Sequence, residues 1–149
     1  LLWNGGCHVH EKFSVEAIVK LKQKHPEAVV MAHLECKAPV LAVADVKGST
    51  ATMLHYAQEH PEIKEYIIAT EAGILHELER NCPNVIFYPV PPEVSEGGVG
   101  CSCNECEYMK MNTLKKIYNA LKFGWPTVEV APEIAKKAVK PIEKMLSLS

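Results

Sequence analysis

The sequence predicts an α/β fold, in which a small parallel sheet is covered by helices and followed by a helical tail. Short apolar runs of strand length, such as 28–32 and 65–69, alternate with helical patterns over short connections. This order is typical of βα units with parallel strands. The run 28–32 is apolar throughout, as expected for a parallel strand that is covered on both faces. After residue 106 the pattern is mainly helical.

The elements expected before residue 30 are the end of a buried strand at 1–3 and a helix at 14–24. Asn4-Gly5-Gly6 is a turn signal that ends the strand and leads into a loop carrying Cys7. Ser14 is a good N-cap, and His25-Pro26 ends the helix. The inward face of this helix is expected to hold Ala17, Ile18 and Leu21.

Further βα units are expected up to residue 88. Gly48-Ser49-Thr50 opens one of their helices and His60-Pro61 closes it. The inward face of that helix is expected to hold Met53, Leu54 and Ala57. The elements are a strand at 28–32, a short helix at 39–44, a strand stub at 45–47, a helix at 48–59, a strand at 65–69, a helix at 74–81 and a strand at 85–88.

Residues 89–105 are expected to form one long loop rich in proline and glycine, followed by the tail. Apolar residues at helical spacing predict a helix over 111–122. Pro132 suits the first position of a last helix, and Pro141 is expected to kink that helix or divide it in two. The spaced apolar residues are Leu114, Ile117, Tyr118 and Leu121.

Composition limits the class of protein. The chain has 149 residues with 48% hydrophobic content, enough for one domain with a core, and its formal charge of −2 favours neither nucleic acid nor an anionic membrane as a partner. No apolar run approaches the roughly 20 residues of a membrane span. We therefore expect a cytoplasmic protein with reduced thiols. Because the sequence starts inside an expected strand, we also expect that upstream sequence is missing.

Three of the six cysteines lie in one polar loop, at Cys101, Cys103 and Cys106. Packing does not require three thiols there, so the loop indicates soft-metal ligation or redox chemistry. A bridge between Cys101 and Cys103 would be strained, whereas Cys103 and Cys106 have the spacing of a redox pair or of two metal ligands. A zinc site would need a fourth ligand, and an iron–sulfur cluster could include the distant Cys7. Idle thiols remain a third possibility, and Cys82 is expected to be structural or idle.

Several polar groups follow the expected strands, and the carboxyl ends of parallel strands meet at one edge of a sheet. They are Cys7, the tetrad from His33 to Cys36, Ser49 with Thr50, and Thr70 with Glu71. We expect them to converge on one rim. Thr70 and Glu71 are expected to act chiefly as a cap there, and His8 and His10 are expected to be solvated.

Two of these groups could carry chemistry. His33 and Glu35 are two residues apart, so an extended strand end points both side chains the same way, where they could share acid and base work. The alternative is a satisfied histidine beside a capping carboxylate. Gly48-Ser49-Thr50 offers N–H groups and hydroxyls to an anion, which matters because Arg80 is the only arginine. Taken alone, a simple N-cap explains that motif better.

The motifs together resemble the quinolinate synthase family over essentially all 149 residues, and correspond to about the carboxyl-terminal half of a family member. The resemblance implies a fold of three αβα domains around a pseudo-threefold axis. Residues 1–12 would end the second domain, 13–106 would form the third, and 107–149 would pack on the missing first domain. The motifs are Trp3-Asn4-Gly5-Gly6-Cys7-His8-Val9-His10, His33-Leu34-Glu35-Cys36, Gly48-Ser49-Thr50, Ala69-Thr70-Glu71-Ala72-Gly73 and Cys106-Glu107-Tyr108-Met109-Lys110-Met111-Asn112.

The resemblance also implies a cofactor and roles for residues. Cys7 and Cys106 would each give one ligand to a 4Fe-4S cluster, whose third ligand would lie outside this chain. His33 and Glu35 match the family's His-Pro-Glu-Cys active-site motif, with Leu34 in place of proline, and would bind substrate and move protons. Ser49 and Thr50 would hold the substrate phosphate. A regulatory disulfide between the two remaining loop cysteines is not implied, because their spacing departs from the family's.

The implied reaction condenses iminoaspartate with dihydroxyacetone phosphate, with loss of phosphate and water, to give quinolinate for NAD biosynthesis. L-aspartate oxidase would act upstream. A fragment of this kind would be inactive alone and would not hold a stable cluster. Two rivals remain open at this point: a non-enzymatic zinc-binding module that uses Cys101, Cys103 and Cys106, and a phosphate-binding α/β domain with idle cysteines.

Overall fold

The computed structural model of the protein describes residues 5–92 and 104–148. The chain divides into two units, Leu1–Lys110 and Met111–Ser149. The expected strand at residues 1–3 and most of the expected loop at 89–105, including Cys101 and Cys103, lie outside the described residues. The assignment of residues 1–12, 13–106 and 107–149 to three parts of a larger protein stays a prediction.

The first unit contains a four-stranded sheet in which every pair of neighbouring strands is parallel. The strands lie in the order β2-β1-β3-β4, so the first and third strands of the chain occupy the centre. The predicted parallel sheet is confirmed, with strand boundaries displaced by no more than one residue. The strands are β1 (Val29–His33), β2 (Val46–Gly48), β3 (Glu65–Ala69) and β4 (Ile86–Pro89).

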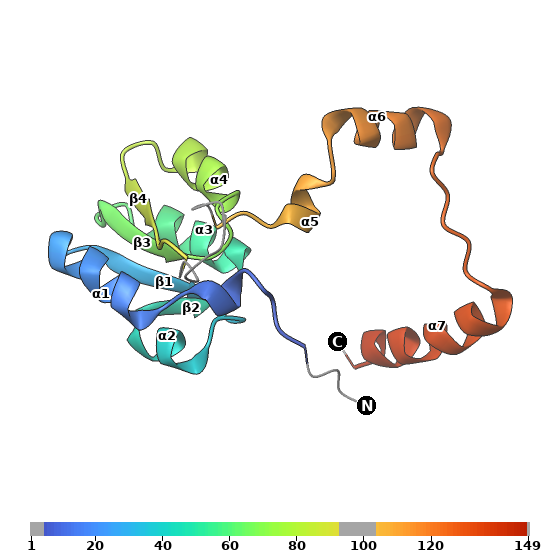
Figure 1. Cartoon of the computed structure of the whole chain (residues 1–149), viewed down its shortest axis with the longest axis horizontal. Helices are drawn as coiled ribbons and strands as arrows, with labels where there is room; N and C mark the ends of the chain where they lie inside the picture. The colour runs from blue at the N-terminus through green and yellow to red at the C-terminus, as the bar shows by residue number, and fades with distance from the viewer. Residues whose placement is uncertain (1–4, 93–103, 149) are drawn as a thin grey trace, which may run out of the picture. The chain divides into compact units, whose positions relative to one another are not determined.

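Helices cover both faces of this sheet, which makes the unit a three-layer αβα domain (Figure 1). Helices α1 (Val15–Lys24) and α2 (Ala38–Val43) pack on one face, and α3 (Thr50–Glu59) and α4 (Ile74–Asn81) pack on the other. A short 3₁₀ helix at His10–Lys12 precedes α1, and α5 (Glu107–Lys110) ends the unit.

The alternation of side chains along the central strands explains the two cores. Val30 and Ala32 of β1 face α1 and α2, while Met31 between them faces α3 and α4. Tyr66 and Ile68 of β3 join Met31 in the second core. The middle residues of both central strands are therefore mostly apolar because both faces of these strands are buried.

The serines predicted to begin helices do so. Ser14 caps α1, where its hydroxyl oxygen accepts a hydrogen bond from the backbone N–H of Ala17 at 3.3 Å. Ser49 caps α3 in the same way, accepting from the N–H of Thr52 at 3.2 Å. Each cap satisfies one of the backbone donors that a helix leaves free at its first turn.

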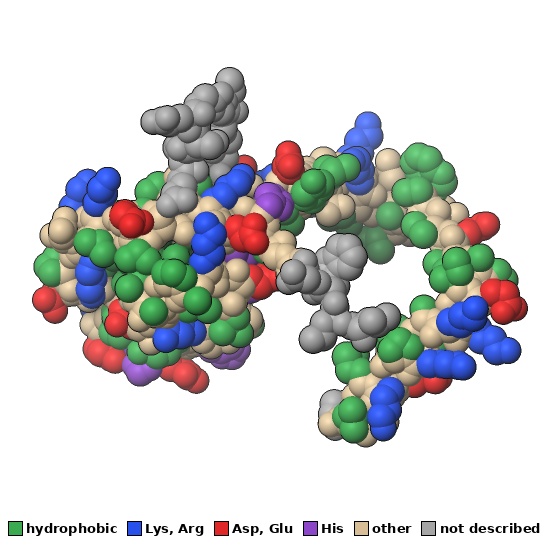
Figure 2. Space-filling model, turned by 60° about the horizontal axis from the view of Figure 1, so that its bottom comes forward, with side chains coloured by type: hydrophobic (Ala, Val, Ile, Leu, Met, Phe, Trp, Pro, Cys, Tyr) green, Lys and Arg blue, Asp and Glu red, His purple; other side chains and the backbone are tan. Residues whose placement is uncertain are grey.

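The second unit contains the two tail helices α6 (Leu114–Phe123) and α7 (Pro132–Leu146). Pro132 is the first residue of α7, as predicted. Pro141 was expected to kink this helix or to divide it in two, and the division is excluded because α7 continues through this residue as one element. Large hydrophobic side chains of this unit are exposed, as Figure 2 shows, including Leu114 at 86% and Leu121 at 84%.

No helix among the described residues is both long and apolar enough to cross a lipid bilayer.

Candidate functional site

The candidate site lies at the carboxyl ends of β1 and β3, where the direction of strand succession reverses. From β1 the chain moves to β2 on one side, and then crosses to β3 on the other side of β1. Such a switch point leaves a crevice where ligands bind in open α/β sheets. His33 ends β1 and Thr70 directly follows β3. His33 and Thr70, two of the groups expected to converge, therefore lie at the carboxyl ends of the two central strands.

His10 lies at this switch point, and the expectation that it is solvated is wrong. Its side chain is buried, and its Nε2 lies 2.9 Å from the hydroxyl oxygen of Thr70, sixty positions along the chain. Its ring stacks on His33 with centroids 4.2 Å apart and planes 11° apart. A weak signal for the burial of His10 was its place between two apolar residues, Val9 and Phe13, both of which are buried.

Glu35 stands beside both imidazoles. One of its carboxylate oxygens lies 3.3 Å from His10 Nδ1 and 3.5 Å from His33 Nδ1, while its side chain is 56% exposed. His33 and Glu35 therefore lie together, as predicted from their spacing. Burial, followed by the neighbouring His33, lowers the pKa of His10, and Glu35 opposes that shift. The site thus favours a neutral imidazole at His10.

Cys36 is a buried and unreactive thiol next to these groups. Its Sγ donates a hydrogen bond to the backbone oxygen of Ala69 at 3.5 Å, across from β1 to β3. Burial raises the pKa of this thiol to about 11. A thiol with such a pKa carries almost no nucleophilic thiolate at neutral pH.

The segment that carries Cys106 is tied to the ends of β3 and β4 by polar groups. The backbone oxygen of Asn104 accepts from the N–H of Ala72 at 2.9 Å, and its side-chain amide donates to the oxygen of Val90. Glu71 accepts from the N–H of Gly73 at 2.7 Å with one oxygen and from the N–H of Cys106 at 3.3 Å with the other. Glu71 therefore caps its own turn, as expected, and also positions Cys106, a role that sequence reasoning missed.

Cys7 and Cys106 lie at this same end of the sheet. Both thiols are partly buried and pack against the core on the α1–α2 face. The residues next to them meet, since the rings of His8 and Tyr108 form an edge-on contact with centroids 5.4 Å apart. Cys7 also belongs to a group with His10 and Glu35 whose ligand atoms lie within 4.8 Å of one another. Two thiols almost a hundred positions apart thus reach one rim.

Ser49 and Thr50 begin α3 at the end of the neighbouring strand β2. Gly48, just before them, pairs with His33 in the sheet register, so the cap lies one strand away from the His33–Glu35 pair. The Ser49 hydroxyl also lies 3.0 Å from that of Thr52. The N-cap interpretation is confirmed, and the phosphate role of Ser49 and Thr50 stays a prediction.

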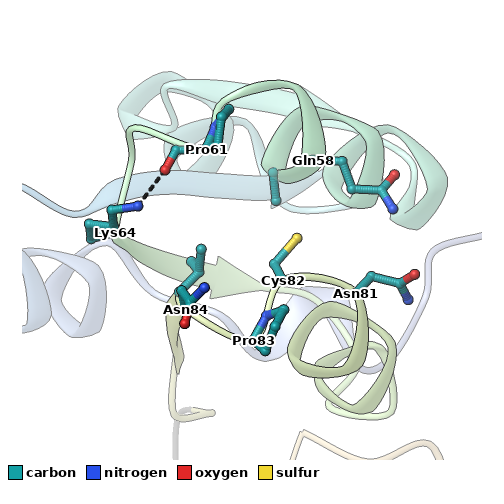
Figure 3. A pocket seen from close by; sticks show the side chains of 9 residues that line it. Gln58, Pro61, Lys64, Asn81, Cys82, Pro83 and Asn84 are labelled. Carbon is teal, nitrogen blue, oxygen red and sulfur yellow. Dashed lines mark hydrogen bonds between the residues drawn. The ribbon is translucent and has the colours of Figure 1, made fainter.

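A hollow of about 380 Å³ lies at the opposite edge of the sheet, between the ends of α3 and α4 and the starts of β3 and β4 (Figure 3). Figure 3 shows Cys82 in its middle and Lys64 hydrogen bonded to the backbone of Pro61 at one side. Burial raises the pKa of Cys82, which suits the structural role expected from sequence. This hollow shares no residue with the candidate site.

Comparison with known proteins gives a consistent result. The family model described as quinolinate synthetase A protein matches residues 1–147. The chain is 46% identical over 147 residues to the quinolinate synthase of Prochlorococcus marinus (strain MIT 9303), with 99% of this chain and 42% of that protein covered. It is 44% identical over 149 residues to the quinolinate synthase of Nostoc sp. (strain PCC 7120), covering all of this chain and 44% of that protein.

A third relative, the quinolinate synthase of Chloroherpeton thalassium, is 42% identical over all of this chain and 45% of its own length. The chain thus spans less than half the length of these curated relatives. A match of the whole chain to one enzyme family does not favour the rival zinc-binding module, two of whose cysteines lie outside the described residues.

Proposed function

The chain belongs to the quinolinate synthase family, and on that premise we propose that it supplies the carboxyl-terminal part of an enzyme that makes quinolinate. The proposed reaction condenses iminoaspartate with dihydroxyacetone phosphate, with loss of phosphate and water, in NAD biosynthesis. The observation that carries the proposal is the cluster of His10, His33 and Glu35 at the switch point, beside Cys7. The fragment alone is inactive in this proposal, because the reaction needs the remainder of the longer protein.

Glu35 is the proposed proton-transfer group. Its carboxylate is exposed enough to meet a substrate, and two imidazoles within 3.5 Å hold it in place. Condensation and loss of water both need a base that removes a proton from carbon and an acid that protonates the departing oxygen. His33 is the more exposed of the two imidazoles. It therefore serves as the acid partner and binds the substrate together with Glu35.

Ser49 and Thr50 are the proposed phosphate-binding residues. They begin α3, where free backbone N–H groups and the positive end of the helix dipole favour an anion. Because Arg80, on α4, is the only arginine of the chain, a phosphate here would be held by hydroxyl groups, backbone N–H groups or lysines. The position of this cap, one strand away from His33, supports the assignment.

The residues present fit part of a 4Fe-4S cluster. Cys7 and Cys106 are thiols, the donors that such clusters need, and both are partly buried at the same rim. When bound, a cluster held by three thiolates supplies a Lewis-acidic iron with an open position. In this proposal Cys7 and Cys106 give two ligands, and the third comes from outside this chain.

The remaining assignments are also proposals. L-aspartate oxidase, as the source of iminoaspartate, is the proposed upstream partner, and the cytoplasm is the proposed location. The tail at 107–149 is proposed to pack on the preceding part of the longer protein. Its exposed hydrophobic side chains, such as those of Leu114 and Leu121, support this arrangement.

The test is a chimera in which this chain replaces the matching 149 residues of the Nostoc relative. After anaerobic purification and reconstitution with iron and sulfide, quinolinate formation is followed from the two proposed substrates. We expect the chimera to make quinolinate, and this chain alone to make none. A folded chimera that holds iron and sulfide but forms no quinolinate would contradict the proposed activity.

Two cysteine variants and a matched control test the proposed ligands in the same chimera. Cys7→Ser and Cys106→Ser are each expected to lower bound iron and to abolish activity. Cys82→Ala is the control, since this buried thiol lies at the far edge of the sheet. Full activity in either of the first two variants would refute the assignment of that cysteine.

A further inference from the structure

Glu71 joins the segment that carries Cys106 to the end of the sheet, and we propose that it is a positioning residue for the 4Fe-4S cluster. It holds Cys106 in place before iron is bound, and it thereby determines how long the 4Fe-4S cluster is retained. The inference rests on the ligand role of Cys106 proposed above. Glu71 itself does not bind iron, so its effect on the 4Fe-4S cluster comes through Cys106 alone.

The two carboxylate oxygens of Glu71 have different partners. Oε2 accepts a hydrogen bond from the N–H of Gly73 at 2.7 Å, which closes a local turn after β3. Oε1 accepts from the N–H of Cys106 at 3.3 Å, 35 positions along the chain. Hydrogen bonds to an ionised acceptor are about twice as strong as those between neutral groups. One side chain therefore serves both the turn and the residue that carries the thiol.

The same turn holds this segment at a second point. The N–H of Ala72, the residue after Glu71, donates to the backbone oxygen of Asn104 at 2.9 Å. Asn104 is buried, and its side-chain amide donates to the backbone oxygen of Val90. These bonds fix where the segment meets the sheet, and the bond from Glu71 adds a contact at Cys106 itself.

The backbone around Cys7 is held by a local contact instead. Its oxygen accepts from the N–H of Glu11 at 3.0 Å, four positions along the chain. Cys106 also has a local contact, from the N–H of Lys110 at 3.1 Å, but this bond orders only α5. A contact from outside its own segment is needed to place Cys106 relative to the sheet, and Glu71 supplies one.

The turn after β3 also reaches the imidazole side of the candidate site. Thr70, directly before Glu71, has its hydroxyl 2.9 Å from Nε2 of His10. Two adjacent residues thus set the position of Cys106 relative to His10. A ligand that is already in place loses little conformational freedom when it binds. Residues that hold metal ligands in position typically change metal affinity by about 10- to 100-fold.

Glu71→Asp separates the two roles of this side chain. Aspartate commonly accepts from the N–H two residues on, so it can keep the bond to Gly73. It is one carbon shorter than glutamate, so its other oxygen no longer reaches Cys106. Glu105→Asp is the matched control, because Glu105 directly precedes Cys106 but pairs with Lys110 of its own segment, at 3.3 Å.

The first measurement is hydrogen exchange, followed by NMR, on the reduced 149-residue chain without iron. We expect the N–H of Cys106 to exchange about tenfold faster in Glu71→Asp than in the unaltered chain, and the N–H of Gly73 to keep its rate. Glu105→Asp should match the unaltered chain at both positions. Equal exchange at Cys106 in Glu71→Asp and the unaltered chain would overturn the proposal. This result does not depend on quinolinate formation, so it is independent of the proposed activity.

The second measurement is loss of the 4Fe-4S cluster from the reconstituted chimera in the presence of an iron chelator. The decay of its broad visible absorbance gives the rate. We expect loss to be about tenfold faster in Glu71→Asp than in Glu105→Asp. The same rate in both variants would refute the role in retention, whether or not the chimeras make quinolinate.

Discussion

At the scale of single residues, the candidate site combines a buried imidazole, that of His10, with an exposed carboxylate, that of Glu35. His10 is buried against Thr70 and His33, whereas Glu35 reaches out from the rim toward solvent. Proton transfer to a bound molecule requires a group that can reach that molecule, and the exposed Glu35 carboxylate can do so. The buried His10 is the fixed imidazole beside it. Loss of the carboxylate charge should therefore affect chemistry far more than folding.

Glu35→Gln is expected to lower kcat of the chimera by about 10²- to 10⁴-fold, the range typical of a lost acid or base. The change keeps the size of the side chain, and Glu35 is half exposed, so the free energy of unfolding should change by less than about 0.5 kcal/mol. Steady-state kinetics and urea unfolding measure the two quantities. The role in proton transfer would be excluded by a kcat within a few-fold of that of the unaltered chimera.

Tyr66 gives a second prediction at this scale. Its hydroxyl is buried in the core between β3 and helices α3 and α4, and forms no hydrogen bond among the described residues. Tyr66→Phe removes this unpaired polar group, so we expect the free energy of unfolding to rise by about 1 kcal/mol at pH 7. A clear loss of stability would mean that the hydroxyl has a partner, such as water, in solution.

The same residue predicts how stability depends on alkaline pH. Burial raises the pKa of Tyr66 from 10.0 to about 12, so the unfolded chain loses this proton at a lower pH than the folded chain does. Ionisation of Tyr66 therefore does not affect the free energy of unfolding below pH 10, and it lowers that free energy as the pH rises from 10 toward 12. Unfolding of Tyr66→Phe should show a shallower decline over that interval. If the free energy of unfolding fell equally with pH in the two proteins, the raised pKa of Tyr66 would be contradicted.

Sequence patterns predicted the positions of His33 and Glu35 but not that of His10. The pair lies within three residues, so the local geometry of a strand end is enough to bring the two side chains together. The burial of His10 depends on Thr70, which is sixty positions away, and no local pattern reports such a contact. Glu71 shows both cases, because its bond to Gly73 is local whereas its bond to Cys106 is not.

At the scale of elements, the strands and helices of the first unit were predicted from the spacing of their apolar residues and from the residues that begin and end each element. Serine caps and X-Pro steps marked the helix boundaries to within one or two residues. Pro141 does not end a helix, since α7 continues on both sides of it. The strand order was not predicted, since it depends on which strands pair rather than on any single segment.

A substitution at the N-cap of α3 can distinguish a structural role of Ser49 from a role in phosphate binding. Glycine replaces an N-cap serine at a cost of only a few tenths of a kcal/mol. Ser49→Gly in the chimera should therefore leave stability almost unchanged while raising KM for dihydroxyacetone phosphate. Ser14→Gly, the same change at the cap of α1, is the matched control and should leave KM unaltered. Equal KM values for the two variants would show that Ser49 is a cap alone.

At the scale of the whole molecule, the core belongs to the first unit. All buried residues among those described lie between Val9 and Asn104. The helices α6 and α7 instead expose large hydrophobic side chains, an arrangement typical of surfaces that associate with another protein surface. Stability and solubility should therefore depend on different parts of the chain.

A chain that ends after Lys110 is expected to unfold within about 4 °C of the full chain, because the tail contributes none of the described core. It should also remain monomeric at higher concentration, since the exposed hydrophobic side chains of α6 and α7 are gone. Thermal unfolding and light scattering measure the two effects. A much lower unfolding temperature would show that residues 111–149 stabilise the first unit.

The ring contact between His8 and Tyr108 also bears on ancestry. It brings the start and the finish of a hundred-residue stretch side by side, with every strand of the sheet in between. A block whose two ends are neighbours can be copied in tandem, or spliced into another gene, without breaking its own architecture. If a larger protein arose by duplication of such a unit, each copy would carry a cysteine at the place where it joins the next copy.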